Sequence, residues 1–350
     1  MRAIVIHRHG GPEVLTYESV WPEPKPGPGE IVVKIAACGL NYLDIFVRNG
    51  MPGEPTRLPQ ITGGDIAGIV EHVGSGVESP RPGDRVLLNP SWGCGQCEYC
   101  INSLTPRCLQ PHMLGEMDPG GLAEYVKCPA AQALGIPDEY PFEQAACLPI
   151  TFGTAYRMVV TRGRTRPGDQ VLVLGAGGGV AIAAMQIAKL IGARVIATAS
   201  TEAKLEEASK FGADEIINYI RDEKWDETVR RMTEKKGVNV IIETIGETTW
   251  ERSIRALGKG GRLVTSGATA GPIGKTDIRY LFRREQELLG SNGWTHEELS
   301  QVTALAFKGK LHPVIDRVLP LERTVEGEIA LERREVFGKV VICPGKRDAA

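Results

Sequence analysis

The chain has 350 residues, of which 42% are hydrophobic and 24% are charged, and its formal net charge is −2. These values are typical of a folded globular protein and exclude an intrinsically disordered one. The small net charge and the lack of long basic tracts also argue against nucleic acid as a partner. Because a single core rarely grows beyond about 250 residues, we expect two domains.

In the first part of the chain, up to about Pro149, short β-type runs are separated by Gly- and Pro-rich turns. The runs are residues 3–7, 31–37, 66–73, 85–88 and 124–128. This pattern predicts an all-β organisation. The N-terminus, MRAIVIHRHGGPEVL, has no uninterrupted apolar core behind a charged segment, so we interpret it as a strand and not as a signal peptide.

From about Phe152 onward, predicted strands alternate with predicted helices. Strands are expected at residues 171–174, 195–199, 215–219, 240–244 and 262–266, with helices up to residue 191 and at 202–211, 225–235 and 249–257. The alternation predicts an α/β fold with a doubly wound parallel sheet of the Rossmann type. Glycines interrupt the longest apolar stretch, residues 171–191, so no membrane span is expected. A helix at 297–307 and strands at 314–320 and 339–343 are expected to return to the first domain.

A glycine-rich turn, Gly175-Ala-Gly-Gly-Gly-Val-Ala181, lies between a predicted strand and a predicted helix. It has the A-x-G-x-x-A form of the dinucleotide fingerprint, with Ala in place of Gly at both ends. Small residues let the backbone approach a pyrophosphate, and the helix N-terminus offers N–H groups and a favourable dipole. A turn that merely permits tight packing is the alternative. We predict that the cofactor-binding loop consists of Ala176, Gly177, Gly178, Gly179 and Val180.

The end of the next strand bears on the choice of cofactor. An acidic residue there would accept hydrogen bonds from the ribose of NAD, but Ala199 occupies that place. Ser200 and Thr201 supply hydroxyl groups, and Lys204, one helical turn later, supplies a positive charge suited to a 2′-phosphate. This favours NADP(H). The alternative is that Ser200 only caps a helix and that Lys204 is a solvated surface residue.

Four of the eight cysteines, Cys94, Cys97, Cys100 and Cys108, fall within fifteen residues of one another. Four thiolates at short spacing match the closed tetrahedral shell of a structural zinc ion, which leaves no position open for a substrate. An iron–sulfur cluster or a redox-active pair of thiols is the minor alternative. The other four cysteines are scattered, and we expect them to be packing residues. The lack of a targeting signal favours the reducing cytoplasm, where cysteines are usually free thiols or metal ligands.

Taken together, the β-rich first part, the four-cysteine lobe, the nucleotide-binding turn and the returning C-terminus resemble the medium-chain dehydrogenase/reductase superfamily along essentially the whole chain. The opening MRAIVIHRHGGPEVL, residues 39–44 (GLNYLD), residues 82–86 (PGDRV) and residues 338–341 (GKVV) are similar to its quinone-oxidoreductase-like branch. The cysteine lobe is instead typical of the zinc alcohol dehydrogenases. The resemblance implies a GroES-like catalytic domain at residues 1–151, a Rossmann domain at 152–294 and a return to the catalytic domain at 295–350.

The resemblance also shows where the chain departs from the alcohol dehydrogenases. Their catalytic metal is held by a cysteine, a Gly-His-Glu motif and a later cysteine. Cys38 matches the first ligand, but Gly64 replaces the histidine and Ile150 replaces the later cysteine. Catalytic zinc normally needs three protein ligands. We therefore expect one structural zinc and no catalytic zinc, although Cys38 with Asp65 is an alternative metal site.

Residue roles carried over by resemblance complete the predicted site. Catalytic or substrate-positioning roles fall on Asn41, Tyr42, Asp44 and Thr151. Further cofactor contacts fall on Tyr219 and Arg334 beside the 2′-phosphate, and on Ser266, Gly267 and Asn292 nearer the nicotinamide. The alternatives are that Asp44 is a structural hydrogen-bonding residue, that Tyr219 is only a strand-end aromatic and that Arg334 pairs with a neighbouring glutamate.

Without a Lewis acid, reduction of an unactivated carbonyl is difficult, whereas electron-poor acceptors remain accessible. We therefore expect an NADPH-dependent reductase of quinones or α,β-unsaturated carbonyls. The runner-up is an alcohol dehydrogenase of small alcohols and aldehydes, and a third possibility is a nucleotide-binding sensor without turnover. The resemblance also implies a homodimer or homotetramer, and we expect a cytoplasmic protein without a membrane or nucleic-acid partner.

Overall fold

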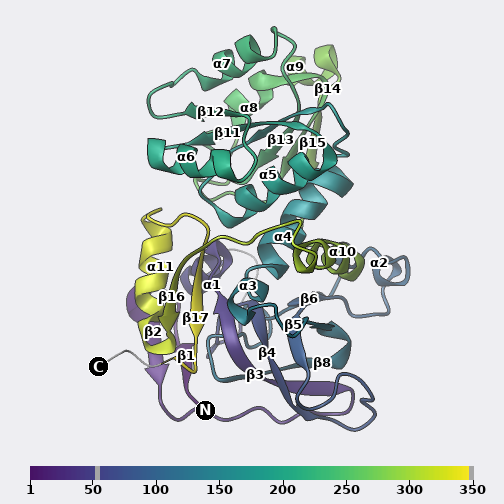
Figure 1. Ribbon diagram of the computed structural model, residues 1–350, viewed down its shortest axis with the longest axis vertical. Coiled ribbons are helices and arrows are strands. Elements are labelled where there is room, and N and C mark those ends of the chain that lie inside the picture. The colour runs from purple at the N-terminus through teal and green to yellow at the C-terminus, as the bar shows by residue number, and fades with distance from the viewer. Residues whose placement is uncertain (52–55, 347–350) are drawn as a thin grey trace. The chain divides into compact units, whose positions relative to one another are not determined.

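The computed structural model describes residues 1–51 and 56–346. The chain forms two compact units, one made of Met1–Ile150 with Trp294–Ala350 and the other of Thr151–Gly293 (Figure 1). We call them the outer-segment unit and the central unit. Within the described residues, no helix is long and apolar enough to cross a membrane.

The outer-segment unit is built on a twisted sheet with the strand order β16-β17-β3-β4-β5-β9, and β8 pairs with β3 beside this path. Its strands are β1 (Ala3–Ile6), β2 (Leu15–Glu18), β3 (Glu30–Gly39), β4 (Asp65–Val73), β5 (Arg85–Leu88), β6 (Ser91–Trp92), β7 (His112–Met113), β8 (Tyr125–Pro129), β9 (Ala133–Gly135), β16 (Ile315–Pro320) and β17 (Lys339–Cys343). Strand β17 pairs antiparallel with the end of β3, which joins the C-terminal segment to the N-terminal one. Ile31, Val33, Ile66 and Val340 belong to the core that these strands share.

The outer-segment unit also contains helices, of which α3 (Phe142–Ala145) and α11 (Thr324–Glu332) pack against the sheet. The helices are α1 (Tyr42–Asn49), α2 (Glu98–Ile101), α3, α10 (His296–Phe307) and α11, with short 3-10 turns at Pro12–Val14, Thr105–Arg107, Ala130–Gln132 and Leu321–Arg323. The all-β interpretation of the first 149 residues is therefore wrong at α1, α2 and α3, of which α1 is the longest. Asn41 and Asp44 form a capping box at the start of α1. Such a capping box stabilises the first turn of a helix, even between segments with a β-type pattern.

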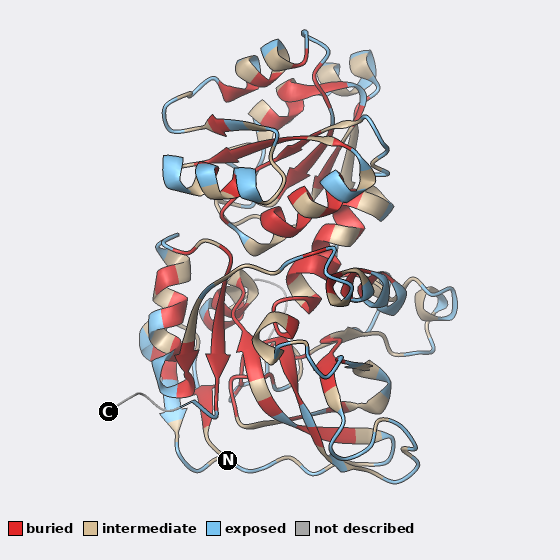
Figure 2. Cartoon of the chain, viewed as in Figure 1, coloured by how far each residue is buried: buried red, intermediate tan, exposed pale blue. Residues whose placement is uncertain are grey.

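The central unit contains a six-stranded parallel sheet with the order β12-β11-β10-β13-β14-β15. Its strands are β10 (Gln170–Val173), β11 (Arg194–Ala199), β12 (Glu215–Asn218), β13 (Val238–Glu243), β14 (Leu257–Thr265) and β15 (Glu287–Gly290). Buried strands run through the middle of this unit (Figure 2). This confirms the predicted doubly wound parallel sheet.

The helices of the central unit lie on both faces of its sheet, with α5 and α6 on one side and α7 and α8 on the other (Figure 1). They are α5 (Gly179–Ile191), α6 (Glu202–Lys210), α7 (Trp225–Met232), α8 (Trp250–Ala256) and α9 (Ile278–Arg284); α4 (Pro149–Tyr156) and a π-helical turn (Arg157–Arg162) precede β10. The chain leaves β10 toward β11 and β12 and then crosses to β13 on its other side. The strand order therefore reverses between β10 and β13, which is where doubly wound sheets bind ligands.

Candidate functional site

The glycine-rich turn follows β10 at the carboxyl edge of the parallel sheet. The Ala176 N–H donates to the Thr198 carbonyl at 2.8 Å, and the Gly178 N–H donates to the Gly175 carbonyl at 3.0 Å. Gly175 has φ +68°, which favours glycine. Gly178 is the N-cap of the 13-residue helix α5, and no side chain caps it. The first N–H groups of α5 are therefore available to an anion such as a pyrophosphate.

Lys204 lies against this turn. Its N–H donates to Thr201 Oγ1, which caps α6, at 3.3 Å. A methyl group in place of the Gly177 hydrogen would lie 3.0 Å from Lys204 Cδ and 3.5 Å from its Nζ. The Tyr219 N–H donates to the Ala199 carbonyl at 3.2 Å. The fold thus brings the predicted 2′-phosphate residues of the central unit to the edge where β11 and β12 end, next to the glycine-rich turn.

A second cation at this edge was missed by sequence reasoning. Arg221 Nη1 pairs with Glu202 Oε1 at 2.9 Å. The same oxygen accepts a hydrogen bond from Asn218 Nδ2 at 2.7 Å. Arg221 lies three residues after the end of β12. This position shortly after a predicted strand is the feature of the sequence that could have identified it.

The residues predicted to lie near the nicotinamide follow the next strands of the sheet. The Ser266 N–H donates to the Glu243 carbonyl at 3.1 Å, just beyond the end of β14. A methyl group on Gly267 would lie 2.9 Å from the Thr244 carbonyl oxygen. Asn292 is exposed and follows β15 by two residues. Ser266 and Gly267 are therefore brought beside the end of β13, whereas Asn292 lies beyond the edge strand.

A buried polar network occupies the outer-segment unit around Asn41. Lys339, 4% exposed, donates from Nζ to Asn41 Oδ1 at 2.6 Å, to the Leu40 carbonyl at 2.7 Å and to Asp65 Oδ2 at 2.8 Å. Asn41 Nδ2 donates to Asp65 Oδ2 at 2.9 Å and to the Gly39 carbonyl at 3.2 Å. Both amide hydrogens of Asn41 are thus used inside the protein. These contacts fix the orientation of the Asn41 side chain.

Asp44 supports this network from the first turn of α1. Its Oδ2 accepts the Asn41 N–H at 2.7 Å, and its Oδ1 accepts the Gly63 N–H at 2.9 Å. Burial raises the pKa of Asp44 to about 6, although these N–H groups and Lys339 oppose the effect. Because Asp44 binds the backbone at both Asn41 and Gly63, we interpret it as a residue that positions Asn41.

The region around Cys38 does not offer the donor set of a catalytic zinc. A methyl group on Gly64 would lie 2.9 Å from Ile150 Cδ1 and 3.0 Å from the Leu114 carbonyl oxygen, so Ile150 fills the space that a side chain at position 64 would need. Asp65 is bound through Oδ2 to Lys339 and through Oδ1 to the Ile150 N–H at 2.7 Å. Burial raises the pKa of the Cys38 thiol well above its usual value, which disfavours the thiolate that binds metal.

The remaining predicted site residues are spread over both units. Tyr42 begins α1, is half-buried and packs edge-to-face on Phe46 with ring centroids 5.3 Å apart. Thr151 is buried in α4. Arg334 is exposed in the turn after α11, with φ +57°. Arg334 belongs to the outer-segment unit, and the other predicted 2′-phosphate residues belong to the central unit.

The four cysteines of the lobe come together. The ligand sulfurs of Cys94, Cys97, Cys100 and Cys108 all lie within 4.8 Å of one another. Cys97 Sγ is 3.5 Å from Cys100 Sγ and 3.9 Å from Cys108 Sγ. A tetrahedral zinc with Zn–S bonds of about 2.3 Å places its sulfurs about 3.8 Å apart. Backbone N–H groups of Cys94 and Gln110 also point at Cys108 Sγ, and such donors stabilise a thiolate. The cluster fits a zinc ion.

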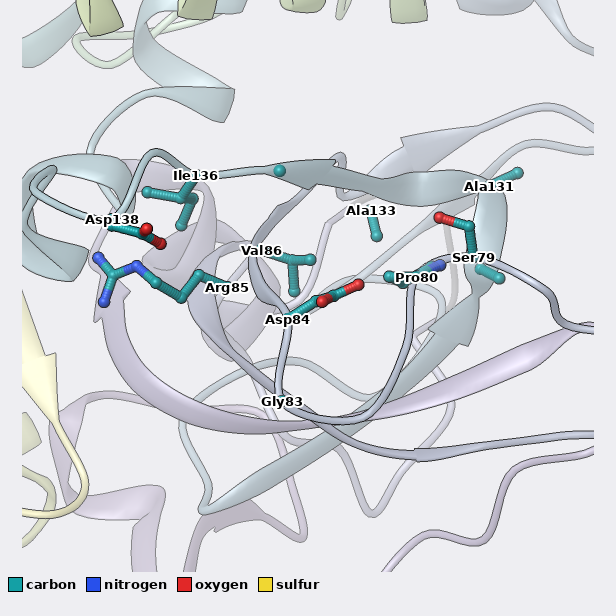
Figure 3. Close-up of a pocket in the computed structure, with 12 residues that line it drawn as sticks. Ser79, Pro80, Gly83, Asp84, Arg85, Val86, Ala131, Ala133, Ile136 and Asp138 are labelled. Carbon is teal, nitrogen blue, oxygen red and sulfur yellow. The ribbon is translucent and has the colours of Figure 1, made fainter.

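A pocket of about 580 Å³ opens elsewhere on the outer-segment unit, and none of the predicted site residues lines it (Figure 3). Asp84, Arg85 and Asp138 contribute its charges. The Arg85 guanidinium already binds the Tyr140 carbonyl at 2.5 Å and lies 3.9 Å from the centroid of the Phe142 ring. Its charge is therefore used within the fold.

Comparisons with known proteins agree with both units. Residues 27–138 match the alcohol dehydrogenase GroES-like domain, and residues 179–308 match the zinc-binding dehydrogenase family. Quinone oxidoreductase from Lama guanicoe is 31% identical over 98% of this chain and 97% of that protein. Acryloyl-coenzyme A reductase from Sulfurisphaera tokodaii is 31% identical over 98% of this chain and 100% of that protein. The crystal structure of an NAD-dependent alcohol dehydrogenase is 45% identical, with a TM-score of 0.94 over 99% of this chain and 100% of that one.

Proposed function

Because the chain belongs to the medium-chain dehydrogenase/reductase superfamily, whose members are NAD(P)H-linked oxidoreductases, we propose that it is an NADPH-dependent reductase of quinones or α,β-unsaturated carbonyls that works without a catalytic metal. The similarity to quinone oxidoreductases and to an acryloyl-coenzyme A reductase supports hydride transfer to a conjugated acceptor. The acceptor is a small molecule.

The observation that carries the proposal is the arrangement around Asp65. Its carboxylate is bound to Lys339 and to the Ile150 N–H, while Ile150 fills the space beside Gly64. At the positions that hold a catalytic metal in alcohol dehydrogenases, Gly64 and Ile150 have no ligand atom in their side chains, and Asp65 is already bound within the protein. Cys38 is what remains of that ligand set. One buried thiol is too few for a catalytic zinc, which uses three protein ligands.

Acceptors that are already electron-poor need no Lewis acid. The cofactor, when bound, supplies the hydride, and the protein orients the reactants and excludes water. Asn41 is held in one orientation by Lys339 and Asp65, and we assign it to positioning the cofactor or substrate. Within the described residues the Tyr42 hydroxyl makes no hydrogen bond, so its proton is available to a substrate oxygen. We assign it as the candidate proton donor.

The preference for NADPH rests on the charges at the ends of β11 and β12. Ala199 offers no carboxylate to the ribose, and Lys204 lies against Gly177. Arg221 adds a second cation at the same edge, held by Glu202. A lysine at this edge favours a 2′-phosphate over a hydroxyl group.

An alcohol dehydrogenase remains the second candidate. The 45% identity to a solved NAD-dependent alcohol dehydrogenase, over nearly the full length of both chains, favours it. It predicts a second tightly bound metal, turnover of saturated aldehydes and the use of NADH.

The deciding experiment follows the oxidation of NADPH and NADH by the purified protein. The acceptors are an ortho-quinone, a conjugated enone, a conjugated acyl thioester and a saturated aldehyde of the enone's size. The proposal is supported if only the conjugated acceptors are reduced and if NADPH is oxidised faster than NADH. Comparable or faster reduction of the aldehyde overturns it in favour of the alcohol dehydrogenase.

A further inference from the structure

Glu243 is a fully buried acidic residue at the carboxyl end of β13. In the parallel sheet β13 lies between β10 and β14. The glycine-rich turn follows β10, so Glu243 stands beside the point where the strand order reverses. A buried carboxylate without a cation needs several hydrogen-bond donors to be tolerated.

Among the described residues four donors bind this carboxylate, and they come from the ten residues that follow it. Its Oε1 accepts the N–H groups of Ile245 at 2.7 Å and Gly246 at 3.1 Å. Its Oε2 accepts the hydroxyls of Thr249 and Ser253, each at 2.9 Å. The side chain therefore folds residues 244–249 back on the end of β13 and anchors the start of α8.

The loop held in this way is joined to the other loops of the same edge. The Ala270 N–H donates to the Ile245 carbonyl at 2.8 Å, and the Glu247 N–H donates to the Gly271 carbonyl at 3.0 Å. On its other side, Ile245 Cδ1 would lie 3.5 Å from a methyl group on Gly175, in the glycine-rich turn. Residues 244–249 thus connect the turn after β10 with the segment after β14 that contains Ser266 and Gly267.

We propose that Glu243 is a positioning residue that sets the conformation of the loop receiving the nicotinamide half of the cofactor. The proposal rests on the proposed function, because it assumes that a nicotinamide dinucleotide binds at this edge. The adenosine half is assigned to residues at the ends of β11 and β12, on the far side of β10 from β13. Loss of the Glu243 anchor should therefore weaken binding of the nicotinamide half selectively.

Two substitutions at this position separate its charge from its hydrogen bonds. In Glu243→Gln the amide oxygen can still accept the two N–H groups, and the Thr249 and Ser253 hydroxyls can turn to accept from the amide nitrogen. In Glu243→Leu both N–H groups lose their acceptor. Gly246→Ala displaces the same loop without altering Glu243, because its methyl group would lie 2.4 Å from the Gly271 carbonyl oxygen. This variant serves if Glu243→Leu does not fold.

Thr233→Val is the matched control. Thr233 is also buried, accepts the Gly237 N–H at 2.9 Å and donates to the Val229 carbonyl at 2.9 Å. It fixes a turn at the amino end of β13, the edge opposite to the cofactor. It should lower the melting temperature without changing affinity for any nucleotide.

The experiment titrates the whole protein with NADPH and with adenosine 2′,5′-bisphosphate, which lacks the nicotinamide half. If the wild type binds NADH more tightly, NADH and 5′-AMP replace this pair. For Glu243→Leu and Gly246→Ala we expect the Kd of the whole cofactor to rise about tenfold or more, with the Kd of the fragment changed less than about twofold. Glu243→Gln should keep both constants near the wild-type values.

Equal weakening of cofactor and fragment, or no weakening of either in folded variants, would overturn the role of Glu243 and leave the proposed function intact. A wild type that binds neither NADPH nor NADH would overturn both proposals together. Selective loss of the whole cofactor in Thr233→Val would also count against the proposal, since general destabilisation would then explain the effect.

Discussion

The Lys339 ammonium lies 2.8 Å from Asp65 Oδ2, and 274 residues of sequence separate the two side chains, which are buried to 95% and 100%. The pair ties the first residue of β17 to the first residue of β4. The same ammonium binds Asn41 Oδ1, so the orientation of the Asn41 amide is fixed by a charge from the other end of the chain. The returning C-terminal segment thus contributes to the candidate site.

Replacement of Lys339 by Met should therefore be severe. It leaves the Asp65 carboxylate buried without its cation, which costs about 3–5 kcal/mol when one partner of a buried pair is removed. It also removes the donor that binds Asn41 Oδ1, so the Asn41 amide is held less firmly. We expect a large fall in melting temperature, and in any folded fraction a kcat for quinone or enone reduction at least about tenfold below that of the wild type.

The double variant Asp65→Asn with Lys339→Met is the informative control. It removes both charges, so part of the stability should return, and the two substitutions should not be additive because their side chains touch. Additive losses in scanning fluorimetry would mean that the pair is not energetically coupled.

Lys204 provides the test of cofactor preference. Lys204→Ala should raise the KM for NADPH by about tenfold or more and that for NADH by much less, since only NADPH carries the 2′-phosphate. Lys210→Ala, which removes an exposed lysine of the same helix that pairs with Glu207, is the control and should change neither constant. Equal effects of Lys204→Ala on both cofactors would remove Lys204 from the phosphate site.

The cysteine lobe gives a prediction about metal. The wild type should contain about one zinc per chain by mass spectrometry of the acid-digested protein, and Cys97→Ser should lose it together with several degrees of melting temperature. Cys128→Ser, at a buried cysteine outside the lobe, should keep the zinc. A Cys97→Ser protein that stays folded but loses kcat would contradict a purely structural role, and two zinc ions in the wild type would favour the alcohol dehydrogenase.

Much of this architecture could be predicted from local patterns. The parallel sheet follows from alternating strands and helices, and the four cysteines of the lobe could be grouped because they lie within fifteen residues of one another. The glycine-rich turn was recognisable because its pattern consists of small residues between a strand and a helix. These signals are short in sequence, so periodicity and spacing suffice to detect them.

What escaped prediction depends on long-range contacts or on short elements. The helix α1 was hidden among β-type runs, although Asn41 and Asp44 form a capping box. Strand β14 begins at Leu257, in a stretch assigned to the end of a helix, because Leu257 pairs with Val238 of β13. Lys339 and Glu243 look like ordinary strand-end charges in the sequence. Only the fold shows that one reaches Asn41 and that the other holds a loop.

A last prediction concerns pH and the buried cluster formed by Arg48, Glu328 and Glu332. Arg48 binds Glu328 Oε2 at 2.7 Å and also pairs with Glu332, so one cation faces two carboxylates. Burial raises the pKa of Glu328 from about 4.5 to about 8, and the nearby Asp44 carboxylate adds to the effect. Within the described residues Glu328 Oε1 has no hydrogen-bond partner, as suits a protonated acid better than a buried carboxylate.

The sign of the pH effect follows from linkage. Because the folded pKa is raised, this group's contribution to stability is fully present below about pH 4.5 and is lost progressively as the pH rises to about 8. Glu328→Gln mimics the protonated acid at every pH. The difference in melting temperature between Glu328→Gln and the wild type should therefore shift in favour of Glu328→Gln by several degrees as the pH rises from about 5 to about 8.5. Glu207→Gln, at an exposed helix position, is the control, and a Glu328→Gln profile parallel to that of the wild type would show that Glu328 is already ionised at low pH.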